Sequence, residues 1–342
     1  MKRFWSLLMA ICCVAIAMPT SAQTKKPLKF HGNPDYFLEV QGEYIFRAVD
    51  EGLDAFPPTA GNDIKRRLAL YNLDALLHDY RYDNSPAFCA FVESRHSKLI
   101  ANLNTPHKKG LKIYKIYNDA FIARTKSVSI AFDISRCRCR GFQERIISDA
   151  NVKAMVEHCD VMFLTHNHGD HVDPFVVDLF VKAGKPVIAT SNILVGVEGV
   201  THYRDNDGPI DVEVELKNGK KLKVKIYPGY QSKLLNNVYA VTTPDNYTIC
   251  HTGDLSHKRN FSWIPSVKEN SPRIDALLLN CWTNSPLKAV EGFNPRIVVT
   301  GHENEMGHTI DHREAYWLTF EKYAKLENNY VVMAWGEWYT IK

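Results

Sequence analysis

Residues 165–173 read Thr-His-Asn-His-Gly-Asp-His-Val-Asp and directly follow a short apolar run. In an extended segment alternate side chains point the same way, so His166, His168 and Asp170 are predicted to face one point. His171 precedes a predicted helix, whose positive N-terminal end favours the neutral imidazole that a metal requires. Three imidazoles and a carboxylate form a ligand set that zinc and its neighbours prefer. The segment therefore predicts a metal site between a buried strand and a helix.

The chain around this motif alternates apolar runs with helical patterns. Continuous apolar runs, typical of strands buried on both faces, occur at residues 161–165, 186–190, 276–279 and 297–300. Residues 128–132 alternate apolar with small polar or neutral residues, as strands do, and residues 222–226 alternate apolar residues with lysines, as a strand with one exposed face does. One helix is expected to start at Asp173 and Pro174, and another to be capped by Asp311. Residues 111–342 are therefore predicted to form a layered α/β domain.

The N-terminal part has a different pattern. Residues 1–22 have a basic start, an apolar run and small residues before a cleavage site after Ala22, which predicts a signal peptide and an exported, periplasmic or extracellular protein. Residues 23–60 are polar with Gly and Pro, and are predicted to be largely irregular. Asn62 is expected to cap a helix, and a second helix is predicted over residues 86–103. The apolar stripe of the first helix comprises Leu73, Leu76, Leu77 and Tyr80. Residues 23–110 are thus predicted to be a helical extension.

The motif at residues 166–171 resembles the His-x-His-x-Asp-His signature of the metallo-β-lactamase superfamily. The resemblance extends over most of residues 111–342, and it is strongest to the branch that holds ascorbate-phosphate lactonases and general metal-dependent hydrolases. It implies an α/β fold, namely an αββα four-layer sandwich with the metals at one edge of its two sheets. In this chain the N-terminal helical extension would precede that sandwich.

Three strand ends supply the other residues that the resemblance implies. Residues 130–133 resemble the strand that ends in the family's structural aspartate, here Asp133. Residues 247–254 resemble the strand that delivers a metal-bridging aspartate, and residues 298–302 the strand that ends in the last histidine ligand. The implied ligands are His166, His168, Asp170, His171, Asp254 and His302. The implied cofactor is zinc, as one ion or two, and iron or manganese also suits imidazole and carboxylate ligands.

One histidine ligand of the family has no counterpart in this chain. Residues 226–232, where it is expected, read Ile-Tyr-Pro-Gly-Tyr-Gln-Ser. Gln231 is the nearest candidate, as a weak neutral ligand through its amide oxygen, and Tyr230 is a candidate substrate contact. His202 lies further upstream and is a second candidate ligand. One metal, or two of unequal affinity, are both compatible with this sequence.

Other histidines and the cysteines are less specific signals. In an extended strand the side chain of His251 would point to the face opposite that of Asp254, so His251 is predicted to be a packed strand residue. His308 is either a substrate contact or proton donor, together with the nearby glutamates, or part of a solvated loop. Cys250 and Cys281 are predicted to be small core residues. Disulfide pairing cannot be assigned from the spacing.

The composition excludes several kinds of partner. Hydrophobic residues make up 45% of the 342 and charged residues 23%, as in ordinary globular proteins. The formal charge of +4, of which Lys2 and Arg3 contribute two, gives no reason to expect nucleic acid as a partner. No second long apolar run follows the first, so stable membrane insertion is not expected. The oligomeric state is not predicted.

Together these features predict a metal-dependent hydrolase of a small ester, lactone or phosphodiester. A metal-activated water would attack this small-molecule substrate, with Asp170 and Asp254 as catalytic carboxylates that orient the water and accept its proton. The alternative is a non-catalytic metal- or ligand-binding protein, because a missing histidine is also what a degenerate site would show.

Overall fold

The computed structural model describes residues 30–203 and 208–342, so the predicted signal peptide lies outside the described residues. Residues 39–342 form one compact unit, and the described residues before them, 30–38, belong to a separate unit. Helix α1 (Pro34–Ala55) begins in that separate unit, and all other described elements belong to residues 39–342.

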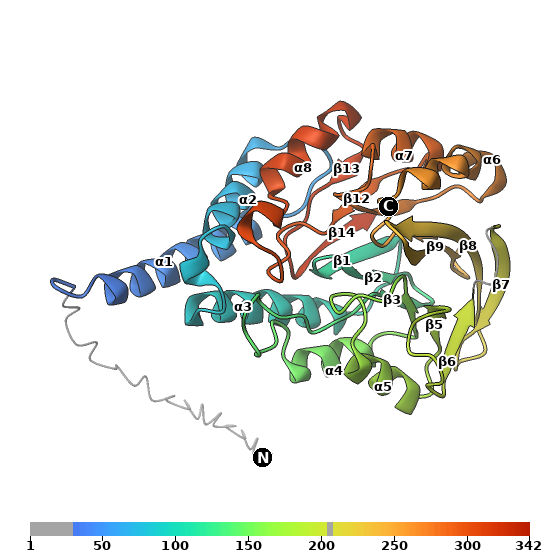
Figure 1. Ribbon diagram of the computed structural model, residues 1–342, viewed down its shortest axis with the longest axis horizontal. Coiled ribbons are helices and arrows are strands. Elements are labelled where there is room, and N and C mark those ends of the chain that lie inside the picture. Colours follow the sequence, from blue (N-terminus) through green and yellow to red (C-terminus); the bar gives the residue numbers. More distant parts are fainter. Residues whose placement is uncertain (1–29, 204–207) are drawn as a thin grey trace, which may run out of the picture. The chain divides into compact units, whose positions relative to one another are not determined.

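Two mixed sheets form the centre of residues 39–342, each with seven strands among the described residues (Figure 1). The first has the order β14-β1-β2-β3-β4-β5-β6. Its strands are β1 (Leu111–Tyr117), β2 (Ala120–Arg124), β3 (Ser129–Phe132), β4 (Val161–Leu164), β5 (Val187–Thr190), β6 (Val200–Tyr203) and β14 (Glu337–Ile341). The second has the order β13-β12-β11-β10-β9-β8-β7. Its strands are β7 (Ile210–Glu215), β8 (Lys221–Gln231), β9 (Leu234–Thr242), β10 (Thr248–His251), β11 (Ala276–Asn280), β12 (Val298–Gly301) and β13 (Tyr330–Val331).

Strand β4 shows why some strands are apolar on both faces. Val161 and Phe163 pack into the core between the two sheets, whereas Met162 and Leu164 pack into the core beneath the outer helices. The helices over the first sheet are α3 (Pro86–Leu103), α4 (Asp149–Glu157) and α5 (Pro174–Lys182), and those over the second are α6 (Val267–Asn270), α7 (Pro286–Phe293) and α8 (Tyr316–Tyr323) (Figure 1). This αββα arrangement confirms the predicted four-layer sandwich.

The prediction that residues 23–60 are largely irregular is wrong for the described part, because residues 34–55 form α1. Phe46, Val49 and Leu53 of this helix are buried. The ring of Phe46 packs against that of Phe91 in α3, with centroids 5.4 Å apart. Gly42 lies against Tyr82, where a Cβ atom would come within 2.5 Å of the ring. Most residues of α1 are exposed and its packing contacts are tertiary, so the Gly and Pro residues in and around the segment concealed the helix.

Helix α2 (Ile64–Leu77) begins one residue later than expected. Its N-cap is Asp63 rather than Asn62, and the Asp63 carboxylate accepts a hydrogen bond from the backbone N of Arg66 at 2.7 Å. The predicted stripe is correct for its three leucines, which are buried, but Tyr80 is exposed. The reason is that α2 ends at Leu77, and the 3₁₀ turn η1 (Tyr80–Tyr82) then points in a new direction.

The predicted cap of α8 is also wrong. Asp311 lies in the separate 3₁₀ turn η4 (Ile310–His312), five positions before α8 (Tyr316–Tyr323) begins. The cap comes instead from Asp74 of α2, whose carboxylate accepts hydrogen bonds from the backbone N of Tyr316 at 2.9 Å and of Trp317 at 3.1 Å. Helix α2 is therefore part of the helical layer that covers the second sheet. The remaining 3₁₀ turns are η2 (Lys258–Ser262), η3 (Ile264–Ser266) and η5 (Ala324–Leu326).

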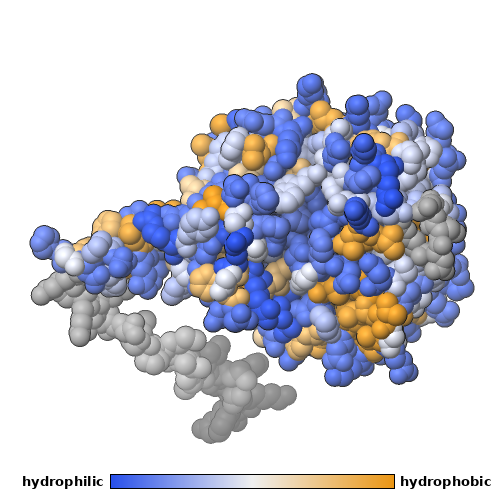
Figure 2. All heavy atoms as spheres, viewed as in Figure 1, coloured by the Kyte–Doolittle hydropathy of each residue, from blue (hydrophilic) through white to orange (hydrophobic). Residues whose placement is uncertain are grey.

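The surface gives no sign of a membrane-spanning element in the described part. On the face seen in Figure 2 hydrophilic residues predominate, and apolar residues form separate patches. None of the described helices combines the length and apolar character needed to cross a bilayer.

Candidate metal centre

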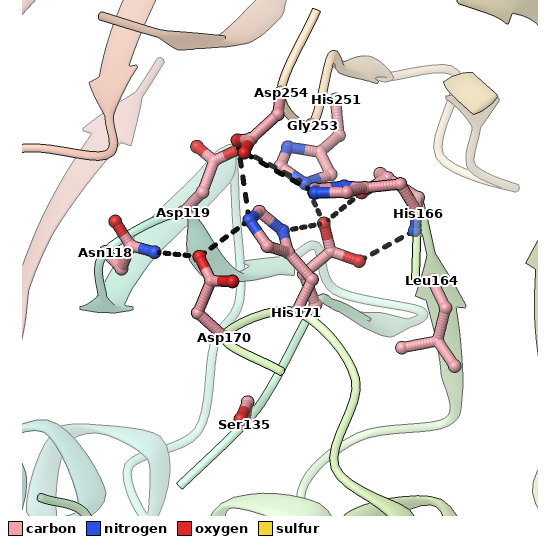
Figure 3. A network of polar contacts seen from close by, with 12 residues as sticks. Asn118, Asp119, Ser135, Leu164, His166, Asp170, His171, His251, Gly253 and Asp254 are labelled. Atoms are coloured by element: carbon pink, nitrogen blue, oxygen red, sulfur yellow. Dashed lines mark hydrogen bonds and ion pairs between the residues drawn. The ribbon is translucent and has the colours of Figure 1, made fainter. Parts of the chain in front are cut away.

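Polar residues follow four strands that end at the same edge of the sandwich. Strands β3 and β4 are parallel neighbours in the first sheet, and β10, β11 and β12 are parallel neighbours in the second. Asp133 follows β3, His166 follows β4, Asp254 follows β10 and His302 follows β12. Because the carboxyl ends of parallel strands meet at one edge, residues far apart in sequence converge there (Figure 3).

The loop from β4 to α5 turns sharply after its first histidine. His166 still pairs with Asn236 of β9 in an isolated β-bridge, which ties the loop to the second sheet. The backbone N of His168 then bonds to the His166 carbonyl, and that of His171 to the His168 carbonyl, each at 3.1 Å. This turn leaves His168 exposed, with its ring centroid 4.7 Å from that of His166, while His166 and His171 are fully buried.

The structure brings five of the six predicted ligands together. The Nε2 atom of His171 lies 3.0 Å from Asp170 Oδ2 and 3.4 Å from Asp254 Oδ1. His166 Nε2 lies 3.4 Å from Asp254 Oδ2. His302 Nε2 lies 3.4 Å from Asp254 Oδ1 and 3.5 Å from Asp170 Oδ2. Asp254 thus lies within 3.4 Å of all three buried imidazoles, of which Figure 3 labels His166 and His171.

These residues form two overlapping groups with the geometry of a metal site. The first is His166, His171 and Asp254, and the second is Asp170, His171 and His302; within each, the possible ligand atoms lie within 4.8 Å of one another. Although they are buried, the Nε2 atoms of His166 and His171 make no hydrogen bond with any described residue. Buried nitrogens that point at carboxylates without hydrogen bonds fit a cation as their missing partner. The donor set therefore suits a divalent metal.

Asp133 orients two imidazoles from behind this centre. Its Oδ2 atom lies 2.9 Å from His171 Nδ1 and 3.0 Å from His251 Nε2, and it accepts a hydrogen bond from the Thr165 hydroxyl at 2.6 Å. Burial alone would raise the pKa of Asp133, but hydrogen bonds from the two histidines lower it below its usual value. A bond at Nδ1 leaves His171 Nε2 free to face the cluster, as in carboxylate–histidine–metal arrangements. His251 is a packed strand residue, as predicted, and also a partner of Asp133.

The clustered charges shift one another's pKa. Burial alone would lower the pKa of His171, but the charges of Asp170 and Asp254 raise it well above its usual value. Burial would raise the pKa of Asp254, but the nearby imidazoles, with His302 first, lower it well below its usual value. Histidines that bind protons this strongly must release them to a metal, so metal binding is expected to weaken at low pH.

Gln231, the candidate for the position of the missing histidine, lies beside Asp254. Its Nε2 donates to Asp254 Oδ2 at 2.8 Å, and its Oε1 is buried without a partner among the described residues. A half-turn of the amide would present Oε1 in place of Nε2 at the same point. Tyr230, one position earlier in β8, packs against Arg259 and does not line the cavity at the site. His202 Nε2 bonds to the Ile193 carbonyl at 2.6 Å and belongs to neither ligand group.

A cavity of about 490 Å³ opens onto this centre. Its walls include His168, Asp170, Gln231, Asp254, Trp282, His302, Glu305, His308, Arg138 and Arg145. His308 Nε2 pairs with Glu305, and the centroid of the Trp282 ring lies 5.3 Å from that of His302 and 5.4 Å from that of His308, with the rings tilted. The cavity volume is that of a small-molecule site.

Sequence reasoning missed several residues at this centre. Asn118 Nδ2 donates to Asp170 Oδ2 at 2.8 Å, and Asn280 Nδ2 donates to Asp254 Oδ1. Asp119 is buried, its carboxylate oxygens make no hydrogen bond with a described residue, and Oδ2 lies 3.9 Å from His251 Nε2; burial raises its pKa to about 7. Asn118 and Asp119 occupy a two-residue turn between β1 and β2, and Trp282 follows β11. None belongs to a motif, so only the fold reveals them.

Comparisons with known proteins match the fold but not the sequence. No family model and no curated protein matches the chain. The metallo hydrolase Igni18 from the archaeon Ignicoccus hospitalis is 19% identical, with a TM-score of 0.51 over 68% of this chain and 99% of that one. A possible metal-dependent hydrolase from Veillonella parvula is 13% identical, with a TM-score of 0.50 over 68% and 100%. The isothiocyanate hydrolase from Delia radicum gut bacteria is 15% identical, with a TM-score of 0.50 over 67% and 99%. With its αββα layers and its polar edge, the chain has the metallo-β-lactamase fold.

Proposed function

We propose that this chain is a metal-dependent hydrolase of small esters, lactones or phosphodiesters, with Asp170 and Asp254 as its catalytic carboxylates. The observation that carries the proposal is the pair of buried imidazole nitrogens, on His166 and His171, that face these carboxylates without a hydrogen bond. Buried polar atoms in native proteins are nearly always paired, so the arrangement supports a bound cation.

Two groups of residues would hold metal. Asp170, His171 and His302 would hold one ion, and His166 and Asp254, with Gln231 as a weak neutral ligand, would hold another. Zinc is our first choice, and iron or manganese suits the same mixture of imidazole and carboxylate. When bound, such an ion lowers the pKa of a water molecule toward neutrality and polarises the bond to be cleaved.

The chain's own residues supply orientation and proton transfer. Asn118 holds Asp170 by a hydrogen bond to Oδ2, and the amides of Gln231 and Asn280 hold Asp254 from two sides. We propose that Asp170 accepts the proton of the attacking water, because its carboxylate lines the cavity and is less buried than that of Asp254. His308, also in the cavity wall, is proposed to give a proton to the leaving group.

The export prediction becomes part of this proposal. Cleavage after Ala22 would start the mature chain at Gln23 and place the hydrolase in the periplasm or outside the cell. Mass determination of the protein recovered outside the cytoplasm tests this directly. A mature chain that still carries residues 1–22 would contradict it.

The hydrolase proposal is tested by turnover of four compound classes: aryl esters, lactones, bis-aryl phosphates and isothiocyanates. The last class is included because one structural neighbour is named as an isothiocyanate hydrolase. We expect turnover of at least one class, loss of it with a chelator, and recovery with added zinc. Asp170→Ala should lower kcat/KM by more than about 100-fold, beyond the loss usual for a residue that only supports a ligand.

Asp178→Ala is the matched control. Among the described residues this exposed aspartate of α5 pairs only with Lys182 at the surface, so its removal should leave turnover unchanged. If the purified protein holds no metal and none of the four classes is turned over, the non-catalytic binding alternative is favoured and the hydrolase proposal fails.

A further inference from the structure

The loop between β3 and α4 carries four arginines that the proposed function does not use. They are Arg136, Arg138, Arg140 and Arg145. Arg136 is committed to structure, because its Nε lies 2.7 Å from Asp173 Oδ2 and its Nη1 lies 2.7 Å from Asp149 Oδ1. Arg140 is exposed and does not line the cavity at the metal centre. Arg138 and Arg145 do line it, together with Asp170 and Asp254.

The two cavity arginines have unused hydrogen-bond donors. Arg145 is partly buried, and its guanidinium group has no hydrogen bond or ion pair with any described residue. Arg138 is exposed and uses only Nε, which donates to the Gln143 carbonyl at 2.9 Å. A guanidinium group without a partner at a binding site is suited to bidentate recognition of a carboxylate or phosphate.

The acidic groups of the cavity already have partners. Asp173 is paired with Arg136, and Glu305 with His308. Asp170 and Asp254 face the buried imidazoles at the metal centre. No carboxylate among the described cavity residues is therefore left to neutralise Arg138 and Arg145, so a complementary anion has to come from the ligand.

We propose that the cavity selects substrates that carry an anionic group, a carboxylate or a phosphate, and that Arg145 binds this group with help from Arg138. Arg145 has the larger role because its partly buried charge is less screened than the exposed charge of Arg138. This inference rests on the proposed function, and it narrows the substrate class to anionic esters, lactones or phosphodiesters of small size.

The test uses two substrates that differ only in the anionic group. In 4-nitrophenyl hemisuccinate a carboxylate replaces the terminal methyl group of 4-nitrophenyl butyrate. We expect the purified protein to prefer the hemisuccinate in kcat/KM. Arg145→Ala should reduce that preference about tenfold, mainly through KM, which corresponds to about 1.4 kcal/mol. Arg138→Ala should reduce it less, and the control Arg140→Ala should leave it unchanged. An unchanged preference in Arg145→Ala, or a wild-type preference for the butyrate, overturns the proposal.

A binding measurement separates this inference from the hydrolase proposal and distinguishes the two anions. Hippurate and phenyl phosphate are titrated calorimetrically into the wild-type protein and into Arg145→Ala. Weaker binding of either anion to Arg145→Ala supports the anion site even if no ester is hydrolysed, and the anion more affected identifies the carboxylate or the phosphate. Equal binding of both anions to the two proteins overturns the inference, whatever the outcome for turnover.

Discussion

The two halves of the metal centre are built differently. The half formed by Asp170, His171 and His302 offers three ionisable ligands, and a hydrogen bond from Asn118 holds its carboxylate. In the other half His166 and Asp254 face each other, but Gln231 stands at the third position and His168 is exposed. A neutral amide binds zinc more weakly than an imidazole. Under the proposed function, we therefore expect one strong metal site, at Asp170, His171 and His302, and one weak site, at His166, Asp254 and Gln231.

The supports behind the two halves differ as well. The residues after His302 are anchored deep in the protein, because Glu303 forms a fully buried ion pair with Lys115, and Asn304 donates to Asp74 at 2.8 Å. Gln231 instead lies at the end of β8, beside the turn that leads into β9. Buried contacts therefore hold the chain next to His302 in the first half, whereas the position of Gln231 in the second half depends on the end of β8.

Removing a ligand from each half should have very different consequences. We expect His302→Ala to lower kcat/KM on the best substrate by more than about 100-fold, because it takes an imidazole from the strong site. His168→Ala should cost less than about tenfold, since its side chain lies at the rim of the cavity. Steady-state kinetics with saturating zinc measures both. Equal losses in the two variants would remove the distinction between the halves.

The folding stability that Asp74 contributes beside the Asp170–His171–His302 half should depend on pH. Burial raises the pKa of Asp74 to about 6, so the folded protein keeps this proton at pH values where the unfolded chain has lost it. The stability that Asp74 gives relative to asparagine is therefore highest below about pH 4 and falls as pH rises to about 6. The difference between the pKa of Asp74 in the folded protein and that of an ordinary aspartate corresponds to about 3 kcal/mol of folding free energy.

Thermal unfolding of the wild type and Asp74→Asn, both with chelator, measures this effect. The difference in Tm between them should change in favour of the variant as pH rises from 4.5 to 7. Two parallel pH profiles would show that Asp74 does not titrate in this range.

Restoring the missing histidine should strengthen the weak half. We expect Gln231→His to bind a second zinc about tenfold more tightly, because an imidazole replaces an amide beside Asp254. Competition with a zinc-binding dye measures the affinity, and Gln143→His, at an exposed position outside the cavity, is the control. If both variants bind the second ion as the wild type does, Gln231 does not occupy a ligand position.

Much of the fold follows from local sequence, because its strands are short runs with clear apolar patterns. The motif at residues 166–171 indicated the site for the same reason: its ligands are close together in the chain. The resemblance also pointed to Asp254 and His302 at strand ends, and the structure brings both to the motif. Their roles as metal ligands stay predictions.

Features that depend on tertiary contacts were missed. Helix α1 buries only a few of its residues and contains two glycines, and the cap of α8 comes from Asp74 in another helix, so neither feature was evident from the local sequence. Arg145 and Trp282 reach the cavity only because a loop and a strand end meet there. The turn after His166 also changed the direction of His168, which a strand-like reading could not anticipate.

The most direct test of the central claim is the metal content of the purified wild-type protein, measured by plasma mass spectrometry during stepwise chelation. Two classes of ion should appear, of which the weaker leaves first, and the tighter class should be absent from His302→Ala. A wild-type protein without any transition metal, or a tight ion that survives in His302→Ala, would contradict the claim that Asp170, His171 and His302 form the principal metal site.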